Sequence, residues 1–254
     1  MMEGAFTLAG IDPLILVGVA LVAFVASIVG GVSGYGAGLI LPPVLAPVVG
    51  VASVVPVMSI AMAMTNGSRV AAFRHEISWR AILLVGAGMA PMCVLSAYIY
   101  TLLPVRAIAA MLGVFLIVSI PIRRKLDKTG WRLGAGGAVA GGAVYGAIVG
   151  SMTGVGPLLL SVMMGLGLRG GALIGTEAAV SMSGSLIKAS VFGSAMLFDF
   201  ELILAGLILG LATVPGAFVA RWMLKRFSPR VHLAMMDALV VAGGLSFLWQ
   251  AWEG

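Results

Sequence analysis

The chain has 254 residues, of which 61% are hydrophobic and only 9% are charged. A soluble domain carries roughly 25% charged and 45–50% apolar residues, so this composition excludes a water-soluble globule and predicts a membrane protein. The formal net charge is +6, and its meaning depends on where the 15 lysines and arginines lie.

Ten apolar segments follow one another along the chain. A helix that crosses a bilayer needs about 20 residues. Eight segments are long enough to cross, whereas 36–50 and 156–168 are short. The predicted fold class is therefore all-α, a polytopic membrane protein. The segments cover residues 14–30, 36–50, 52–73, 81–101, 105–122, 133–150, 156–168, 172–193, 201–222 and 231–252.

Twelve of the fifteen basic residues gather in three clusters at or near the ends of these segments, at 69–80, 123–132 and 221–230. Short loops rich in Lys and Arg stay in the cytoplasm, so the clusters predict three cytoplasmic loops. The loop at 194–201 carries Asp199 and Glu201 without a base and is expected outside. Both termini are expected outside as well. Orientation and contact with the lipid bilayer explain the basic charge, and no nucleic-acid partner is predicted.

Two of the apolar stretches are expected to be hairpins. If 123–132 and 221–230 are both inside, the chain between them crosses the membrane an even number of times. The helices at 172–193 and 201–222 supply two crossings, so 133–168 must begin and end on one side. Its second arm spans only about 20 Å at about 1.5 Å per residue, which predicts a thin or re-entrant hairpin. The same reasoning makes 14–50 a hairpin that opens from the other face.

The two hairpin turns share a sequence pattern. Val29–Gly36 and Val149–Gly156 both fit V-G-x-x-[ST]-G-x-G, and at nearly the same offset Arg69 falls on Lys188. Each half holds five segments, an odd number of passes if each hairpin counts as two. We therefore expect oppositely oriented repeats, 1–126 and 127–254, within one membrane domain, as in many secondary transporters.

These motifs resemble the sulfite exporter TauE/SafE family of bacterial and archaeal anion permeases. The resemblance implies a multi-pass permease of the cell membrane for sulfite, sulfonates or related anions. In the first turn, Gly34–Gly38 reads Gly-Tyr-Gly-Ala-Gly where the family has adjacent glycines, so the substrate within this class stays open. The resemblance rests on the turn at 30–38 with Pro42, on Asn66–Arg69, and on the second copy at 150–157 with Gly175–Glu177 and Lys188.

A turn inside the membrane places the start of a helix there. The first backbone amides of a helix lack intrahelical partners and carry about half a positive charge, which suits an oxyanion. We expect Gly34–Gly38 to open one short helix, and Gly156 with Pro157 to open the other. The alternative role of these glycines is close helix packing. The predicted substrate-binding residues of the two turns are Ser33, Gly34, Tyr35, Gly36, Thr153, Gly154 and Gly156, with the two hydroxyls capping the helices or facing the substrate.

Arg69 and Lys188 occupy equivalent places near the ends of segments that run in opposite directions. Each is expected to guide the anion in one half of an alternating-access cycle. Asn66 and Ser185, about one helical turn away, are expected to act as neutral donors. The alternative is that both cations reach out to the lipid headgroups.

Glu177 and Asp237 are acids inside apolar segments, where an ionisable group is a functional suspect. Either acid could couple anion movement to the proton gradient, and Glu177 is preferred because its segment also carries Lys188. The alternative is a structural acid bonded to a neighbouring helix. His75 and His232 lack Cys or carboxylate neighbours at ligand spacing, so no metal site or cofactor is predicted.

No nucleotide-binding or metalloprotease motif is present, which argues against an enzyme. An anion channel and a non-transporting assembly protein remain alternatives, the first because Ser33–Gly36 faintly resembles a carbonyl-lined filter. The expected partners are a small anion and the lipid bilayer, and a homodimer is left open.

Overall fold

The computed structural model describes residues 13–33, 37–126, 132–223 and 229–253. Over these ranges the chain forms ten α-helices and one short 3-10 helix, and no strand. Each predicted apolar segment overlaps with one α-helix. The helices are α1 (Pro13–Ser33), α2 (Leu41–Val49), α3 (Val51–Phe73), α4 (Trp79–Leu102), α5 (Val105–Leu126), α6 (Ala135–Val149), α7 (Gly156–Gly165), α8 (Gly170–Ser194), α9 (Phe200–Met223) and α10 (Pro229–Glu253), with the 3-10 helix η1 at Ala37–Leu39.

The two segments expected to be short do form short helices. α2 has nine residues and α7 has ten. At about 1.5 Å per residue each is roughly 15 Å long, about half the thickness of a bilayer's hydrocarbon core. The expectation that Gly34–Gly38 opens the first short helix is wrong, because α2 begins at Leu41. Pro42 and Pro43 lack an N–H and are tolerated in the first turn of a helix, which explains the later start.

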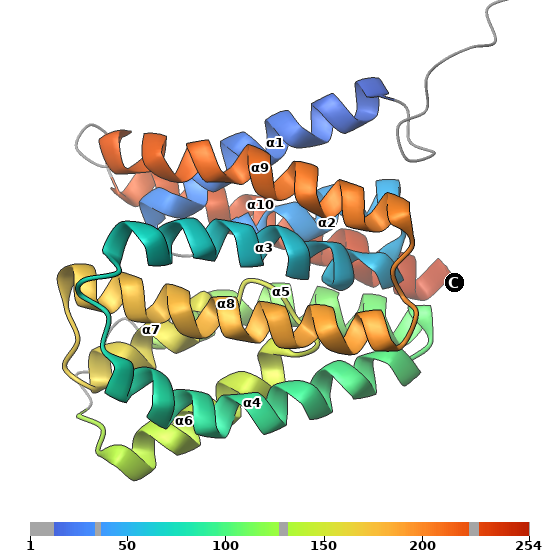
Figure 1. Ribbon diagram of the computed structural model, residues 1–254. Coiled ribbons are helices and arrows are strands. Elements are labelled where there is room, and N and C mark those ends of the chain that lie inside the picture. Colours follow the sequence, from blue (N-terminus) through green and yellow to red (C-terminus); the bar gives the residue numbers. More distant parts are fainter. Residues whose placement is uncertain (1–12, 34–36, 127–131, 224–228, 254) are drawn as a thin grey trace, which may run out of the picture.

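The long helices lie roughly side by side (Figure 1). α3 and α8 pack against each other in the middle, and α4 with α6 forms one edge while α1 with α9 forms the opposite edge. α5 packs on α10, and the short helices α2 and α7 contact α10 and α5 respectively. The centre of the molecule is therefore the α3–α8 pair.

Glycines bring α4 and α6 into backbone contact. Gly142, Gly146 and Gly150 repeat at every fourth residue of α6, which places them on one face. A Cβ atom on any of them would collide with a backbone carbonyl oxygen of α4. Ser96 adds a bond across this contact, since its Oγ donates to the carbonyl of Gly146 at 2.9 Å. These glycines serve packing, as small residues do between membrane helices.

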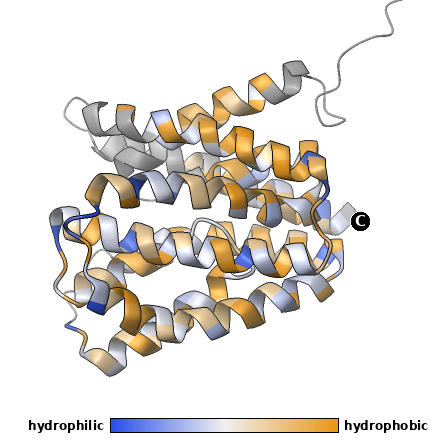
Figure 2. Cartoon of the chain, viewed as in Figure 1, coloured by the Kyte–Doolittle hydropathy of each residue, from blue (hydrophilic) through white to orange (hydrophobic). Residues whose placement is uncertain are grey.

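The outer surface of the described helices is apolar. Leu83, Leu211 and Leu245 are more than half exposed. Figure 2 shows hydrophobic residues over most of the helices, with hydrophilic residues mainly at helix ends and at points along the central helices. Among the described residues, α3 and α4 meet the length and hydropathy expected of a membrane-spanning helix. A surface of this kind suits lipid rather than water.

Candidate functional site

A cavity of about 70 Å³ lies between α3, α8 and the turn that precedes α7. Residues from both halves of the chain surround it. One side is polar, with two basic groups, one carboxylate and several hydroxyls, and the rest is glycine or apolar. The lining residues are Gly38, Met62, Asn66, Arg69, Tyr145, Val149, Thr153, Gly154, Val155, Gly156, Glu177, Ser181, Ser185 and Lys188.

One face of α8 supplies four polar side chains to this cavity. Glu177, Ser181, Ser185 and Lys188 follow one another at intervals of three or four residues, which aligns them along one side of a helix. All four are buried, and Glu177 and Lys188 are only 3% and 2% exposed. The row extends about 16 Å along the helix axis. Polar groups this deep in an apolar helix need partners.

Lys188 finds its partner in the turn before α7. Its Nζ donates a hydrogen bond of 3.1 Å to the carbonyl of Met152. The burial of this side chain excludes the alternative that it reaches out to the headgroups. An ammonium group has three N–H donors, and Met152 is its one acceptor within the described part of the chain. The remaining donors are therefore available to a ligand in the cavity.

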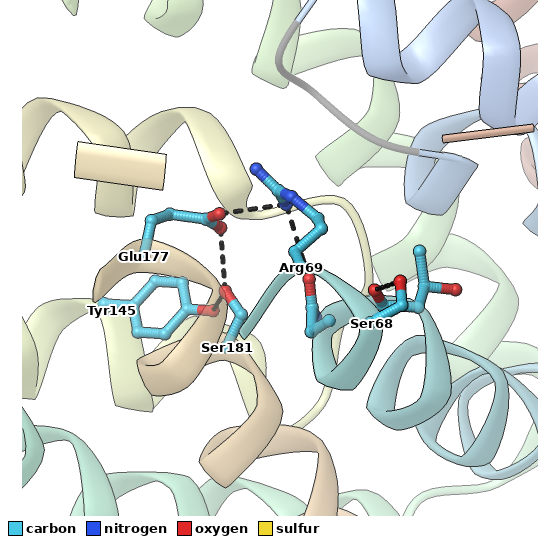
Figure 3. A network of polar contacts seen from close by, with 7 residues as sticks. Ser68, Arg69, Tyr145, Glu177 and Ser181 are labelled. Atoms are coloured by element: carbon cyan, nitrogen blue, oxygen red, sulfur yellow. Dashed lines mark hydrogen bonds and ion pairs between the residues drawn. The ribbon is translucent and has the colours of Figure 1, made fainter. Parts of the chain in front are cut away.

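Arg69 and Glu177 form an ion pair across the interface of α3 and α8. Nη1 of Arg69 lies 3.0 Å from Oε2 of Glu177, and the same Nη1 is 3.4 Å from Oδ1 of Asn66. Ser181 donates from Oγ to Oε1 of Glu177 at 2.9 Å. The hydroxyl of Tyr145 follows, 3.2 Å from Oγ of Ser181. Figure 3 shows this chain of contacts, with the carboxylate of Glu177 between the guanidinium group and the serine.

The two glycine-rich turns meet at the cavity. Thr153 donates from Oγ1 to the carbonyl of Gly38 at 2.8 Å. Gly154 has φ +76, a conformation that favours glycine, and a Cβ on Gly38 would come within 2.8 Å of the Gly154 nitrogen. Of the two roles expected for the Thr153 hydroxyl, capping of α7 is wrong, because the cap residue is Val155 and its side chain makes no capping bond. The threonine hydroxyl instead joins the two turns.

α7 begins at Gly156 with Pro157 in its first turn, as the sequence predicts. Within the described part of the chain, the backbone N–H groups of Val155 and Gly156 have no acceptor, whereas the N–H of Leu158 bonds to the carbonyl of Val155 at 3.1 Å. Val155 and Gly156 line the cavity. Free amides at the start of a helix attract a negatively charged ligand.

The structure brings most of the predicted site residues together, although they come from distant parts of the sequence. Those that line the cavity are Asn66, Arg69, Thr153, Gly154, Gly156, Glu177, Ser185 and Lys188. Gly34, Tyr35, Gly36 and the side chains of Ser33 and Asp237 lie outside the described residues. Within the described residues, no group of His, Cys, Asp and Glu could hold a metal ion.

Sequence reasoning missed Ser181 and Tyr145. Ser181 lies four residues after Glu177 and four before Ser185, so helical periodicity could have found it. Tyr145 belongs to a glycine-rich helix and carries no such signal. Its place in the site follows from the packing of α6 next to α4, and of α4 on α8.

Comparison with known proteins identifies one family. A family model described as Sulfite exporter TauE/SafE matches residues 19–247, a stretch that includes both turns and every residue that lines the cavity. Comparison with curated proteins and with solved structures gives no match. Members of this family are membrane transporters of sulfite-related anions and not enzymes. A match over nearly the whole length places this chain in the sulfite exporter TauE/SafE family.

Proposed function

We propose that the protein is a secondary transporter of a small sulfur-containing anion, such as sulfite or a sulfonate, and that the anion binds in the cavity between the two turns. One observation carries this proposal above the others. The ammonium group of Lys188 is buried with a single protein acceptor, at the same cavity as Arg69 and the free amides of Val155 and Gly156. A buried cation without a counterion is costly, and an anionic ligand supplies the missing charge.

The charge and size of the cavity restrict the ligand. Arg69 and Lys188 contribute two positive charges and Glu177 one negative charge, so the net charge of the cavity lining is one positive charge. A volume of about 70 Å³ has room for a compact oxyanion. Asn66 and Ser185 add neutral donors at the wall of the cavity. The side-chain oxygen of Asn66 accepts from Arg69, which leaves its N–H groups for a ligand. The hydroxyl of Ser185 makes no hydrogen bond within the described part of the chain.

We further propose that the chain is an inverted repeat of 1–126 and 127–254 that works by alternating access. The helix packing supports this reading, because its most extensive contacts recur when the two halves are exchanged. The first helix of each half packs on the fourth helix of the other, as α1 does on α9 and α6 on α4. Third helices pack together, as do fifth helices, and each short helix contacts the last helix of the opposite half.

The short helices support re-entrant hairpins. α2 and α7 are too short to cross the hydrocarbon core, which needs about 20 residues. In this proposal the chain spans the membrane several times, with both termini and the loop at 194–201 outside and the basic clusters inside. Broken helices with their amino ends at the midplane are how many transporters bind an anionic substrate.

Arg69 and Lys188 would then accompany the anion in opposite halves of the cycle. α3 and α8 run antiparallel, since Gly67 lies near Met182 while Gly175 lies near Phe73. Arg69 sits beside Glu177, and Lys188 lies about 16 Å further along α8. This distance separates their positions along the helix axis and not their charged ends, and both side chains line the same cavity. Glu177, paired with one of them, is the proposed site of proton coupling.

A binding screen with the purified protein tests this function. Anions that bind the folded state raise the unfolding temperature, and the rise grows with the ratio of anion concentration to dissociation constant. We expect sulfite, thiosulfate or a small sulfonate to raise it, and aliphatic carboxylates of larger volume to have no effect. Counterflow of the bound anion in proteoliposomes then separates a carrier from a channel. Stabilisation by no sulfur oxyanion, or flux without counterflow, would contradict the proposal.

A further inference from the structure

The carboxylate of Glu177 occupies the position that an anionic ligand would take on Arg69. Its side chain is buried at the wall of the cavity, and Oε2 lies 3.0 Å from the guanidinium nitrogen. Oε1 accepts from Ser181, whereas Oε2 accepts no hydrogen bond within the described part of the chain and has only the ion pair with Arg69. The carboxylate of Glu177 is thus an internal counterion for Arg69, one of the two cations of the site.

Lys188 and Arg69 differ in the charge of the protein group that each one contacts. Lys188 is held by a neutral carbonyl, that of Met152. Arg69 faces a full negative charge. An incoming anion can therefore join Lys188 without displacing a charge, but it must compete with Glu177 for Arg69.

Few other ionisable groups surround this carboxylate. α3 contributes Arg69 and α6 contributes Tyr145, which reaches Glu177 through Ser181. α4 contributes Cys93, whose Sγ bonds to the carbonyl of Gly184. α7 carries no ionisable side chain. Besides Lys188 on its own helix, Glu76 lies against the first turn of α8 at Gly171, where it is exposed.

We propose that Glu177 makes the site sensitive to the charge of the anion, so that a divalent anion binds together with one proton and a monovalent anion binds without one. This inference rests on the proposed function. With Glu177 ionised, the net charge of the site is one positive charge, and a monoanion neutralises it. A dianion would give the occupied site a net negative charge. Protonation of Glu177 removes its charge, releases Arg69 and lets both cations face the dianion.

The direction in which anion affinity changes with pH follows from the protonation of Glu177. Since dianion binding takes up a proton, affinity for a dianion rises as pH falls, by up to about tenfold per pH unit. Affinity for a monoanion stays constant over the same range. Proton uptake is therefore the quantity that distinguishes the two ligands.

Sulfate and methanesulfonate are suitable probes, because one is a dianion and the other a monoanion throughout the neutral range. Calorimetric titrations of the purified protein in two buffers that differ in ionisation enthalpy give the number of protons taken up. We expect about one proton per sulfate and none per methanesulfonate. In Glu177→Gln, sulfate should bind more tightly and without proton uptake. Glu76→Gln, which removes an exposed carboxylate outside the cavity, should behave as the unmodified protein does.

The outcomes separate this inference from the function on which it rests. Sulfate binding without proton uptake, or uptake that persists in Glu177→Gln, overturns the inference and leaves the transporter proposal in place. Failure of sulfite, sulfate and methanesulfonate to bind at all overturns the transporter proposal as well. The proton count of the unmodified protein decides the matter even if a variant does not fold.

Discussion

Thr153 donates a hydrogen bond from its Oγ1 to the carbonyl of Gly38 at 2.8 Å, and this bond joins the turn of one half to the turn of the other. Both residues are buried, so water does not compete for the bond. The turn before α7, which presents the amides of Val155 and Gly156, is therefore held in place by the opposite half of the chain.

Thr153→Val should weaken both the fold and transport. The substitution keeps the shape of the side chain but leaves the buried carbonyl of Gly38 without its donor, at a cost of about 1–3 kcal/mol. Thermal unfolding and uptake into proteoliposomes measure the two effects. Thr153→Ser keeps the hydroxyl and is the control. Equal behaviour of the valine and serine variants would show that the bond between the turns is unimportant.

Gly154→Ala should disrupt the contact between the turns. Gly154 has φ +76, and a Cβ there would meet the side chain of Leu39. The backbone conformation alone costs about 1–2 kcal/mol for a residue other than glycine. Gly86→Ala is the matched control, since a Cβ at that helical position meets nothing within 4 Å. We expect lower transport and a lower unfolding temperature for the first variant only, and a neutral Gly154→Ala would contradict the argument.

Lys188→Gln should reduce anion affinity by at least about tenfold, the loss expected for one charge-assisted hydrogen bond. The substitution removes the charge and keeps a polar side chain, so insertion into the membrane should be preserved. Uptake of labelled sulfite at several concentrations gives the apparent affinity, and size-exclusion chromatography checks the fold. Arg80→Gln, which changes an exposed cation at the start of α4, should leave uptake unchanged. Normal uptake by Lys188→Gln would remove this residue from the site.

Arg69→Gln should destabilise the protein more than the double variant Arg69→Gln/Glu177→Gln does. The single change leaves the buried carboxylate of Glu177 without its counterion, whereas the double change leaves two neutral amides. Breaking a buried pair from one side costs about 3–5 kcal/mol, and the exposure of Arg69 to the cavity should lower this figure. The unfolding temperatures of the four proteins in the cycle test the prediction. A double variant less stable than Arg69→Gln would refute it.

The proposed orientation can be checked by cysteine labelling. The single native cysteine, Cys93, is fully buried and should not react with a membrane-impermeant maleimide. Met196→Cys, at an exposed position just after α8, should be labelled in intact cells. Arg74→Cys, at the end of α3, should be labelled only after the membrane is opened. The reverse pattern would invert the proposed topology.

The helices were predictable from the sequence because a membrane restricts apolar segments to few lengths. The start of α2 was not predicted, because the glycines at 34–38 and the pair Pro42–Pro43 both suit the start of a helix, and the prolines lie in its first turn. The role of Thr153 was also unpredictable. Its acceptor, Gly38, lies in the other half of the chain, and only the packing of the two turns brings them together.

The site was predictable to the extent that polar residues inside apolar helices are rare. That rule selects Asn66, Arg69, Glu177 and Lys188, and the cavity gathers all four. It does not reveal that Arg69 is paired with Glu177, because the pairing depends on the register of α3 against α8. Their roles in binding and coupling stay predictions until the variants are measured.

The row of glycines on α6 has a consequence for motion. Gly142, Gly146 and Gly150 hold α6 against the backbone of α4 without side chains that could yield. Such a pair moves as one piece, and Gly150 lies only three residues before Thr153. A tilt of this pair relative to α3 would therefore carry the turn and its amides with it. A bulky residue at Gly146, whose Cβ would meet the carbonyl oxygen of Met89, would separate the two helices and so shift the turn.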